Sequence, residues 1–97
     1  MILHTLNTGP NTAAFTECLQ VAASGDALLL TGDGVYCSIS DTDACNLILD
    51  SGAELYVLET DACAAGIQDK VCNHATLTDY DGFVGLSERF TRQLAWY

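Results

Sequence analysis

Five cysteines are the residues of this sequence best suited to covalent chemistry, because a thiolate is both a nucleophile and a metal ligand. They are Cys18, Cys37, Cys45, Cys63 and Cys72. No CxxC pair occurs, and Cys72-Asn73-His74 offers two ligands without an evident third and fourth, so the spacing does not predict a structural zinc site. The odd number also argues against a disulfide scaffold. We therefore expect reduced thiols, with no bound metal and no cofactor.

Three of the cysteines have surroundings that bear on reactivity. Cys18 falls on the apolar stripe of an expected helix, which favours an inert core thiol, with a sulfur-handling role as the alternative. Cys37 and Cys63 lie near the expected starts of helices, where the helix dipole can favour the thiolate. Cys45 and Cys72 have no activating feature in the sequence. Cys18 is the candidate sulfur-handling residue.

Other residues could bind a ligand or a partner. Gly32-Asp33-Gly34 could bring backbone amides close to an anion, but the spacing of a phosphate-binding loop is absent and Asp33 would repel a phosphate. A tight turn is the favoured interpretation. His4 lies among apolar residues, which is typical of a hydrogen-bonded structural histidine. Trp96 and Tyr97 indicate either an interface or a tail docked on the core.

Strands alternating with helices would position these residues. We expect strands at Ile2–Leu6, Asp26–Thr31, Glu54–Glu59 and, weakly, Ala75–Thr78, with a closing strand or tail at Gln93–Tyr97. We expect helices from Asn11 or Thr12 to Ser24 (closed by Gly25), from about Val35 with Asp33 as cap, from Thr60 or Asp61 to Gly66, and over Tyr80–Phe90 with Asp79 as cap. The acidic stretch Ser38–Gly52 receives no element. The pattern predicts one domain, 1–97, with a parallel sheet covered on both faces.

Ligand sites in such a sheet gather beyond the carboxyl ends of the strands. Three loops are expected there: Asn7–Asn11, Gly32–Val35 and Thr60–Cys63.

The charge balance excludes some partners. Thirteen acidic residues face only Lys70, Arg89 and Arg92, for a net charge of −10. Nucleic-acid binding draws on basic groups, so the sequence predicts no direct nucleic-acid contact and favours a partner with a basic face. No apolar run approaches the roughly 20 residues of a membrane span. The first residues do not resemble a secretory signal, so we expect a cytoplasmic protein without membrane contact.

Several segments resemble the TusB/DsrH family. They are LHT at Leu3–Thr5, GDALLLTGDGVY at Gly25–Tyr36, LYVLETDACAAGI at Leu55–Ile67, DYDGFVGL at Asp79–Leu86 and AW at Ala95-Trp96. The similarity is spread over the whole chain in the same order. It implies a three-layer α/β/α fold of the DsrE-like (flavodoxin-like) kind, with a mostly parallel five-stranded sheet.

The resemblance also implies partners and a pathway. Members assemble with TusC/DsrF-like and TusD/DsrE-like subunits into a dimer of heterotrimers. In the Tus branch this complex passes persulfide sulfur, through a TusE/DsrC-like carrier, towards 2-thiolation of the tRNA wobble uridine. In the Dsr branch related complexes serve intracellular sulfur oxidation, and the context Glu17-Cys18-Leu19 is similar to that branch. We favour the Tus branch because it is more widespread. A small nucleotide- or anion-binding module and a self-assembling structural protein are the alternatives.

Leu58 is the residue that the resemblance makes most informative. In TusD/DsrE-type subunits the persulfide-carrying cysteine lies at the end of the third strand, and Leu58 occupies that position here. Cys63 lies five residues later and cannot replace it without rebuilding the loop. The resemblance therefore implies a non-catalytic subunit of a sulfurtransferase complex, with Cys18 as the only secondary sulfur site.

Overall fold

Five parallel strands form one sheet in the order β4-β3-β2-β1-β5. The computed structural model describes residues 1–97. Its strands are β1 (Ile2–Leu6), β2 (Ala27–Leu30), β3 (Glu54–Leu58), β4 (Ala75–Thr78) and β5 (Arg92–Trp96). The expected five-stranded α/β sheet is confirmed. The final segment is a strand paired along β1 rather than a loose tail.

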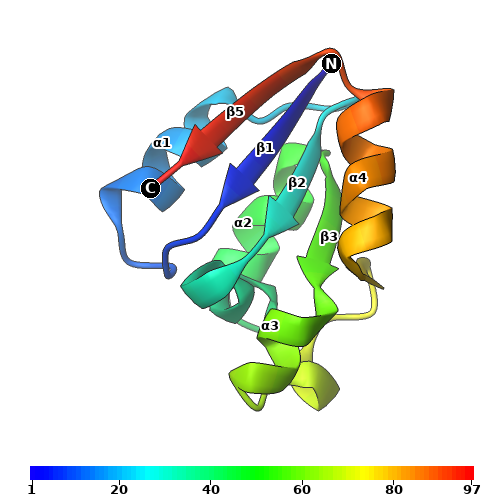
Figure 1. Cartoon of the computed structure of the whole chain (residues 1–97). Coiled ribbons are helices and arrows are strands. Elements are labelled where there is room, and N and C mark those ends of the chain that lie inside the picture. The colour runs from blue at the N-terminus through cyan, green and yellow to red at the C-terminus, as the bar shows by residue number, and fades with distance from the viewer.

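Helices cover both faces of this sheet (Figure 1). They are α1 (Ala13–Val21), α2 (Asp43–Ser51), α3 (Glu59–Ala64) and α4 (Tyr80–Arg89), with 3-10 helices η1 (Gly32–Ser38) and η2 (Gln68–Lys70). Helix α4 lies on one face, and α1 and α2 lie on the other.

The central strand β2 joins the two cores. All four of its residues are buried, as its lack of alternation predicts. Ala27 and Leu29 pack under α4 with Leu86 and Phe90, whereas Leu28 and Leu30 belong to the larger cluster under α1 and α2. Each fully buried leucine of this kind stabilises the fold by about 1.5–3 kcal/mol.

Capping side chains start two of the helices where the sequence predicts. Thr12 Oγ1 accepts the amide of Phe15 at 3.2 Å, and α1 begins directly after it. Asp79 Oδ1 accepts the amide of Gly82 at 2.8 Å and starts α4. Both bonds satisfy amides that a helix leaves without an intrahelical partner.

The end of α1 was predicted three residues too late. The helix ends at Val21 instead of Ser24. The Asp26 carboxylate accepts the amide of Ala23 at 3.1 Å, and the amide of Asp26 donates to the Ala23 carbonyl at 3.0 Å. These bonds form a turn that competes with another helical turn, and Gly25, with φ +94°, lies in it.

Two predicted caps are wrong. Asp33 does not cap a helix from Val35, because η1 begins at Gly32 and its preceding residue, Thr31, makes no side-chain cap. Helix α3 begins at Glu59, before both Thr60 and Asp61.

Helix α2 was not predicted, although its signals are present. Thr42 Oγ1 accepts the amide of Cys45 at 3.3 Å, and Gly52 ends the helix with φ +82°. Ala44, Cys45 and Ile48 are its buried residues at helical spacing. The acidic composition of the segment obscured this pattern.

Candidate functional site

The three segments expected at the carboxyl edge of the sheet lie there, but two of them are helical instead of loops: Gly32–Val35 lies in η1 and Thr60–Cys63 lies in α3. The amide of Thr31 donates to the carbonyl of Leu6 at 3.0 Å. Gly34 lies against the same carbonyl so closely that a Cβ would collide with it. The amide of Gly32 donates to Asp61 Oδ2 at 2.8 Å, which ties η1 to α3. The edge is therefore a connected surface.

The hollow between η1 and α3 is acidic. Its volume is about 230 Å³, and it is lined by Gly32, Asp33, Tyr36, Asp61, Ala64 and Ala65. Two carboxylates and no basic side chain line it, so an anion entering it would be repelled. The Gly32 amide, which an anion site would need, already donates to Asp61. This geometry does not favour the nucleotide- or anion-binding alternative.

Leu58 is the last residue of β3, and its side chain is apolar and buried. Its side chain is 3% exposed, and it is the residue that directly precedes α3. Cys63 is exposed on α3, beside a separate hollow of about 300 Å³ whose other lining residues include Glu59 and Asp69. The end of β3, where the related catalytic subunits are expected to carry their cysteine, has no thiol.

Cys18 and Cys37 are fully buried in the core under α1 and α2. Burial raises the pKa of the Cys18 thiol to about 12. The pKa of Cys37 is also raised to about 12 by burial and, secondarily, by the neighbouring Cys18. Cys37 is the sixth residue of η1 instead of lying near a helix start. Neither thiol ionises appreciably near neutral pH, and Cys18 remains a predicted sulfur-handling residue without an exposed thiolate.

A second thiol pair joins segments that the sequence does not relate. Cys45 from α2 and Cys72 line one small hollow of about 170 Å³ with His74. Burial raises the pKa of Cys45 to about 12, and the Cys72 side chain adds to that rise. The pairing depends on the antiparallel bridge between Ile39 and Val71, which has no local sequence signal. No three His, Cys, Asp or Glu side chains lie close enough together to hold a metal ion.

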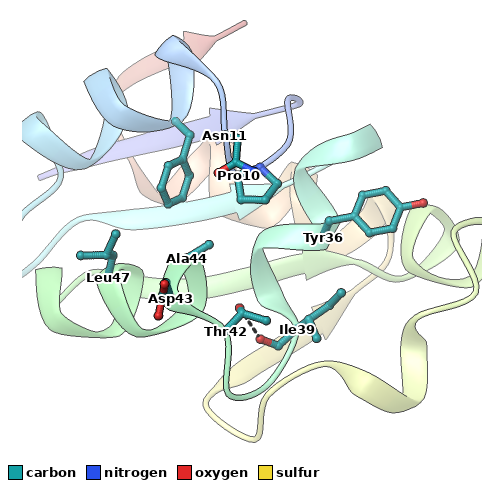
Figure 2. Close-up of a pocket in the computed structure, with 9 residues that line it drawn as sticks. Pro10, Asn11, Tyr36, Ile39, Thr42, Asp43, Ala44 and Leu47 are labelled. Atoms are coloured by element: carbon teal, nitrogen blue, oxygen red, sulfur yellow. Dashed lines mark hydrogen bonds between the residues drawn. The ribbon is translucent and has the colours of Figure 1, made fainter.

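An apolar groove opens between α1, η1 and α2 (Figure 2). Its volume is about 370 Å³, and its lining residues are Pro10, Asn11, Phe15, Tyr36, Ile39, Thr42, Asp43, Ala44 and Leu47. The Tyr36 side chain points away from the rest (Figure 2). No cysteine lines the groove, so it has no thiol for persulfide chemistry, and Asp43 is its only charged lining residue.

A buried polar network joins the middle of β1 to the residue before β2 and to the end of β5. His4 Nε2 and Asp26 Oδ2 are 3.0 Å apart, and Trp96 Nε1 donates to His4 Nδ1 at 3.1 Å. The second Asp26 oxygen accepts the amide of Ile2 at 2.9 Å. His4 is thus the hydrogen-bonded histidine that its apolar neighbours predict, and Trp96 is docked on the core.

None of the helices is long and apolar enough to cross a membrane. The all-parallel sheet between two helical layers defines a three-layer α/β/α protein with a DsrE-like fold. Residues 9–93 match the family model described as "DsrH like protein". The chain belongs to the DsrH/TusB family.

Curated relatives support this assignment over their full length. The chain is 36% identical to Protein TusB of Yersinia pestis (strain Pestoides F) over 95 residues, covering 98% of this chain and 100% of the relative. It is 38% identical to Protein TusB of Pectobacterium parmentieri with the same coverage.

Solved structures support the fold. The crystal structure of the ychN protein from E. coli superimposes with a TM-score of 0.73 at 12% identity, covering 97% of both chains. The solution structure of protein Tm0979 from Thermotoga maritima gives 0.70 at 21% identity, covering 92% of this chain and 93% of that one.

Proposed function

We propose that this chain is a non-catalytic subunit of a sulfur-relay complex that passes persulfide sulfur towards 2-thiolation of the tRNA wobble uridine in the cytoplasm. The observation that carries the proposal is Leu58: a buried leucine stands at the end of β3, the position expected for the reactive cysteine of the catalytic subunits. A relay step needs an accessible thiolate, and the end of β3 supplies none, because the exposed Cys63 lies farther along on α3 beside a separate hollow.

Partners of the family supply the missing chemistry. TusC/DsrF-like and TusD/DsrE-like subunits would join this chain in a dimer of heterotrimers, and a TusE/DsrC-like carrier would accept the sulfur. The net charge of −10 supports a role that contacts proteins instead of tRNA.

A DsrH-type role in intracellular sulfur oxidation is the second candidate. The observation that favours it is the Glu17-Cys18-Leu19 context on α1. Full burial of Cys18 weighs against direct sulfur transfer there, because the thiol has no access to a carrier in this conformation.

Co-purification tests partners and pathway together. Tagged chain, isolated from its own host, should carry two homologous subunits, and light scattering should give the mass of a dimer of heterotrimers. Deleting the gene should lower 2-thiouridine in bulk tRNA, measured by mass spectrometry of nucleosides. A complex with normal thiolation in the deletion strain would point to the sulfur-oxidation branch.

Cysteine variants separate a scaffold from a relay subunit. In the deletion strain, Cys63→Ser and Cys18→Ala should both restore 2-thiouridine, because neither thiol is required by the proposal. Leu58→Asp, which buries a charge at the end of β3, is the matched loss-of-fold control. Failure of Cys63→Ser to restore thiolation, with the complex intact, would assign a relay role to this chain.

A further inference from the structure

The outer edge of β5 is free. Strand β5 ends the strand order and pairs only with β1, and no backbone hydrogen bond joins it to any other part of the chain. Figure 1 shows it in red along the margin of the sheet. Residues 92–95 are all exposed, and the strand contains no proline. A free edge of this kind can pair with a strand of another chain.

Anchors at both ends hold β5 in position. Near its start, Gln93 Nε2 donates to the carbonyl of Ser87 on α4 at 3.1 Å. At its end, Trp96 Nε1 donates to the fully buried His4 at 3.1 Å. A strand that is already ordered loses less conformational entropy when it pairs, so β5 is a preformed edge.

Charge distinguishes β5 from the other free edge. Residues 89–97 contain Arg89 and Arg92 and no acidic residue, in a chain with thirteen acids. Arg89 is paired with Glu54 at 3.0 Å, which leaves Arg92 as the free cation of the strand. Strand β4, at the opposite edge, is followed directly by Asp79 and Asp81. Strand β4 itself is uncharged, but the acidic residues that follow it add to the negative charge on which two copies repel each other, whereas the surroundings of β5 add positive charge.

We propose that β5 pairs antiparallel with β5 of a second copy of this chain, about a twofold axis through Leu94, so that the two sheets become continuous. A twofold axis at Leu94 sets each leucine opposite its own copy. The same register sets Arg92 opposite Trp96 of the second copy, and Gln93 opposite Ala95.

Side-chain chemistry suits these pairs. Arg92, Leu94 and Trp96 alternate along β5 and therefore share one face. Leu94 is 41% exposed in the single chain, and pairing would cover it with another leucine. Arg92 would lie beside the half-buried indole of Trp96, a favourable pairing of a cation with an aromatic ring. No acidic side chain belongs to β5, so none lies between the two paired strands.

The inference goes beyond the proposed function and does not depend on it. The isolated chain should form this dimer without any other subunit. If the chain also joins two homologous subunits, β5 would lie on the twofold axis of the dimer of heterotrimers.

Charged substitutions of Leu94, at the centre of the proposed β5–β5 pairing, test the proposal. Purified full-length chain is examined by sedimentation velocity over a concentration series, as wild type, Leu94→Lys, Leu94→Glu and an equimolar mixture of the two variants. Like charges directly opposite each other are destabilising, so each variant alone should raise the dimer dissociation constant by up to about fivefold. The mixture should recover the dimer, because Lys and Glu then face each other. This recovery also shows that both variants are folded.

Val84→Lys and Val84→Glu are the matched controls, because Val84 is 54% exposed on α4 and lies outside β5. Both should dimerise like wild type. A wild-type chain that is monomeric throughout the series overturns the proposal and leaves the proposed function untouched. A dimer dissociation constant that Leu94→Lys leaves unchanged, or that the mixture does not recover, also overturns it.

Discussion

The indole N–H of Trp96 donates to Nδ1 of His4 at 3.1 Å, joining two residues 92 positions apart. Because an indole nitrogen can only donate, Nδ1 must be the acceptor, and the ring proton lies on Nε2. Nε2 then donates to Asp26 Oδ2 at 3.0 Å. No buried side-chain polar atom lacks a partner. The network therefore fixes the tautomer of His4 and holds the last strand on the first.

Removing the indole donor should destabilise the fold. Trp96→Phe keeps an aromatic ring but leaves Nδ1 of the fully buried His4 without a donor, and we expect a loss of about 1–3 kcal/mol in the free energy of unfolding. Urea titration followed by circular dichroism measures it. Tyr97→Phe is the control, because Tyr97 is 83% exposed and should change stability by less than about 0.5 kcal/mol. Equal effects of the two variants would contradict the role of the indole bond.

Asp26 should make stability depend on acid pH. Burial alone would raise the pKa of its carboxyl, but hydrogen bonds from His4, Ile2 and Ala23 outweigh burial and hold the pKa below its ordinary 3.8. A carboxyl with a lowered folded-state pKa stabilises above its unfolded pKa, and that stability is lost as the pH falls through the folded value. Asp26→Asn should therefore be less stable at pH 7 by about 1–3 kcal/mol. Its stability should also change less than that of wild type below about pH 4.

Urea midpoints measured from pH 7 down to pH 3 check this dependence. Glu54→Gln is the control: the Glu54 carboxyl also has a lowered pKa, from hydrogen bonds to Tyr56 and Arg89, but its ion pair with Arg89 is exposed. Exposed pairs contribute little, so this variant should follow the wild-type curve closely. An Asp26→Asn curve parallel to that of wild type would refute the assignment.

Local signals in the sequence were sufficient for much of the fold. Thr12 and Asp79 start their helices through side-chain bonds to nearby amides, and the unbroken apolar run of β2 marks the centre of the sheet. At the predicted cap of α3, a distant partner decided the outcome. Asp61, an expected cap, accepts instead from the amide of Gly32, 29 residues away.

Part of the candidate site could likewise be predicted from the sequence, and part depends on tertiary packing. The meeting of three segments at the carboxyl edge follows from parallel topology, and Leu58 was located by the family resemblance. The contacts of Cys45 with Cys72 and of Trp96 with His4 depend on tertiary packing alone. No spacing rule in the sequence brings those residues together.

Gly34 should be intolerant of any side chain. An alanine Cβ there would collide with the carbonyl of Leu6 at the end of β1, and backbone must move to relieve the collision. We expect Gly34→Ala to cost about 1–3 kcal/mol of unfolding free energy, measured by urea titration. Gly85→Ala is the control, because its Cβ meets open space on α4. It should be neutral or stabilising by about 0.5–1 kcal/mol, as alanine is the better helix former. A tolerated Gly34→Ala would contradict the close packing of η1 on β1.

The cysteines should differ sharply in reactivity. Cys63 is exposed, whereas the other four are buried. With a pKa of about 12, the thiolate fraction of Cys18 is on the order of 10⁻⁵ at pH 7. Brief iodoacetamide treatment of the native chain should therefore label Cys63 alone, and denaturant should expose all five. Peptide mass spectrometry identifies the labelled cysteines, and Cys63→Ser should abolish labelling of the native chain. Rapid native labelling of Cys18 or Cys37 would mean that the core opens far more readily than its packing indicates.

The absence of a strand-end thiol predicts that the isolated chain transfers no sulfur. Incubation with a persulfide donor should leave the buried Cys18 and Cys37 unmodified, because their thiols are neither ionised nor accessible. Cys63 can react at the surface, but its neighbours Glu59 and Asp69 are acidic and would oppose a second thiolate approaching to remove the sulfur.

We therefore expect less than stoichiometric persulfide, confined to Cys63, and no transfer to an acceptor thiol. Labelled cysteines are mapped by mass spectrometry after alkylation, with Cys63→Ser as the background. Stoichiometric, transferable persulfide on Cys18, Cys37 or Cys63 would show that this subunit is itself a relay station. The sulfur would then be carried by one of these cysteines, and not by a residue at the end of β3, where Leu58 lies.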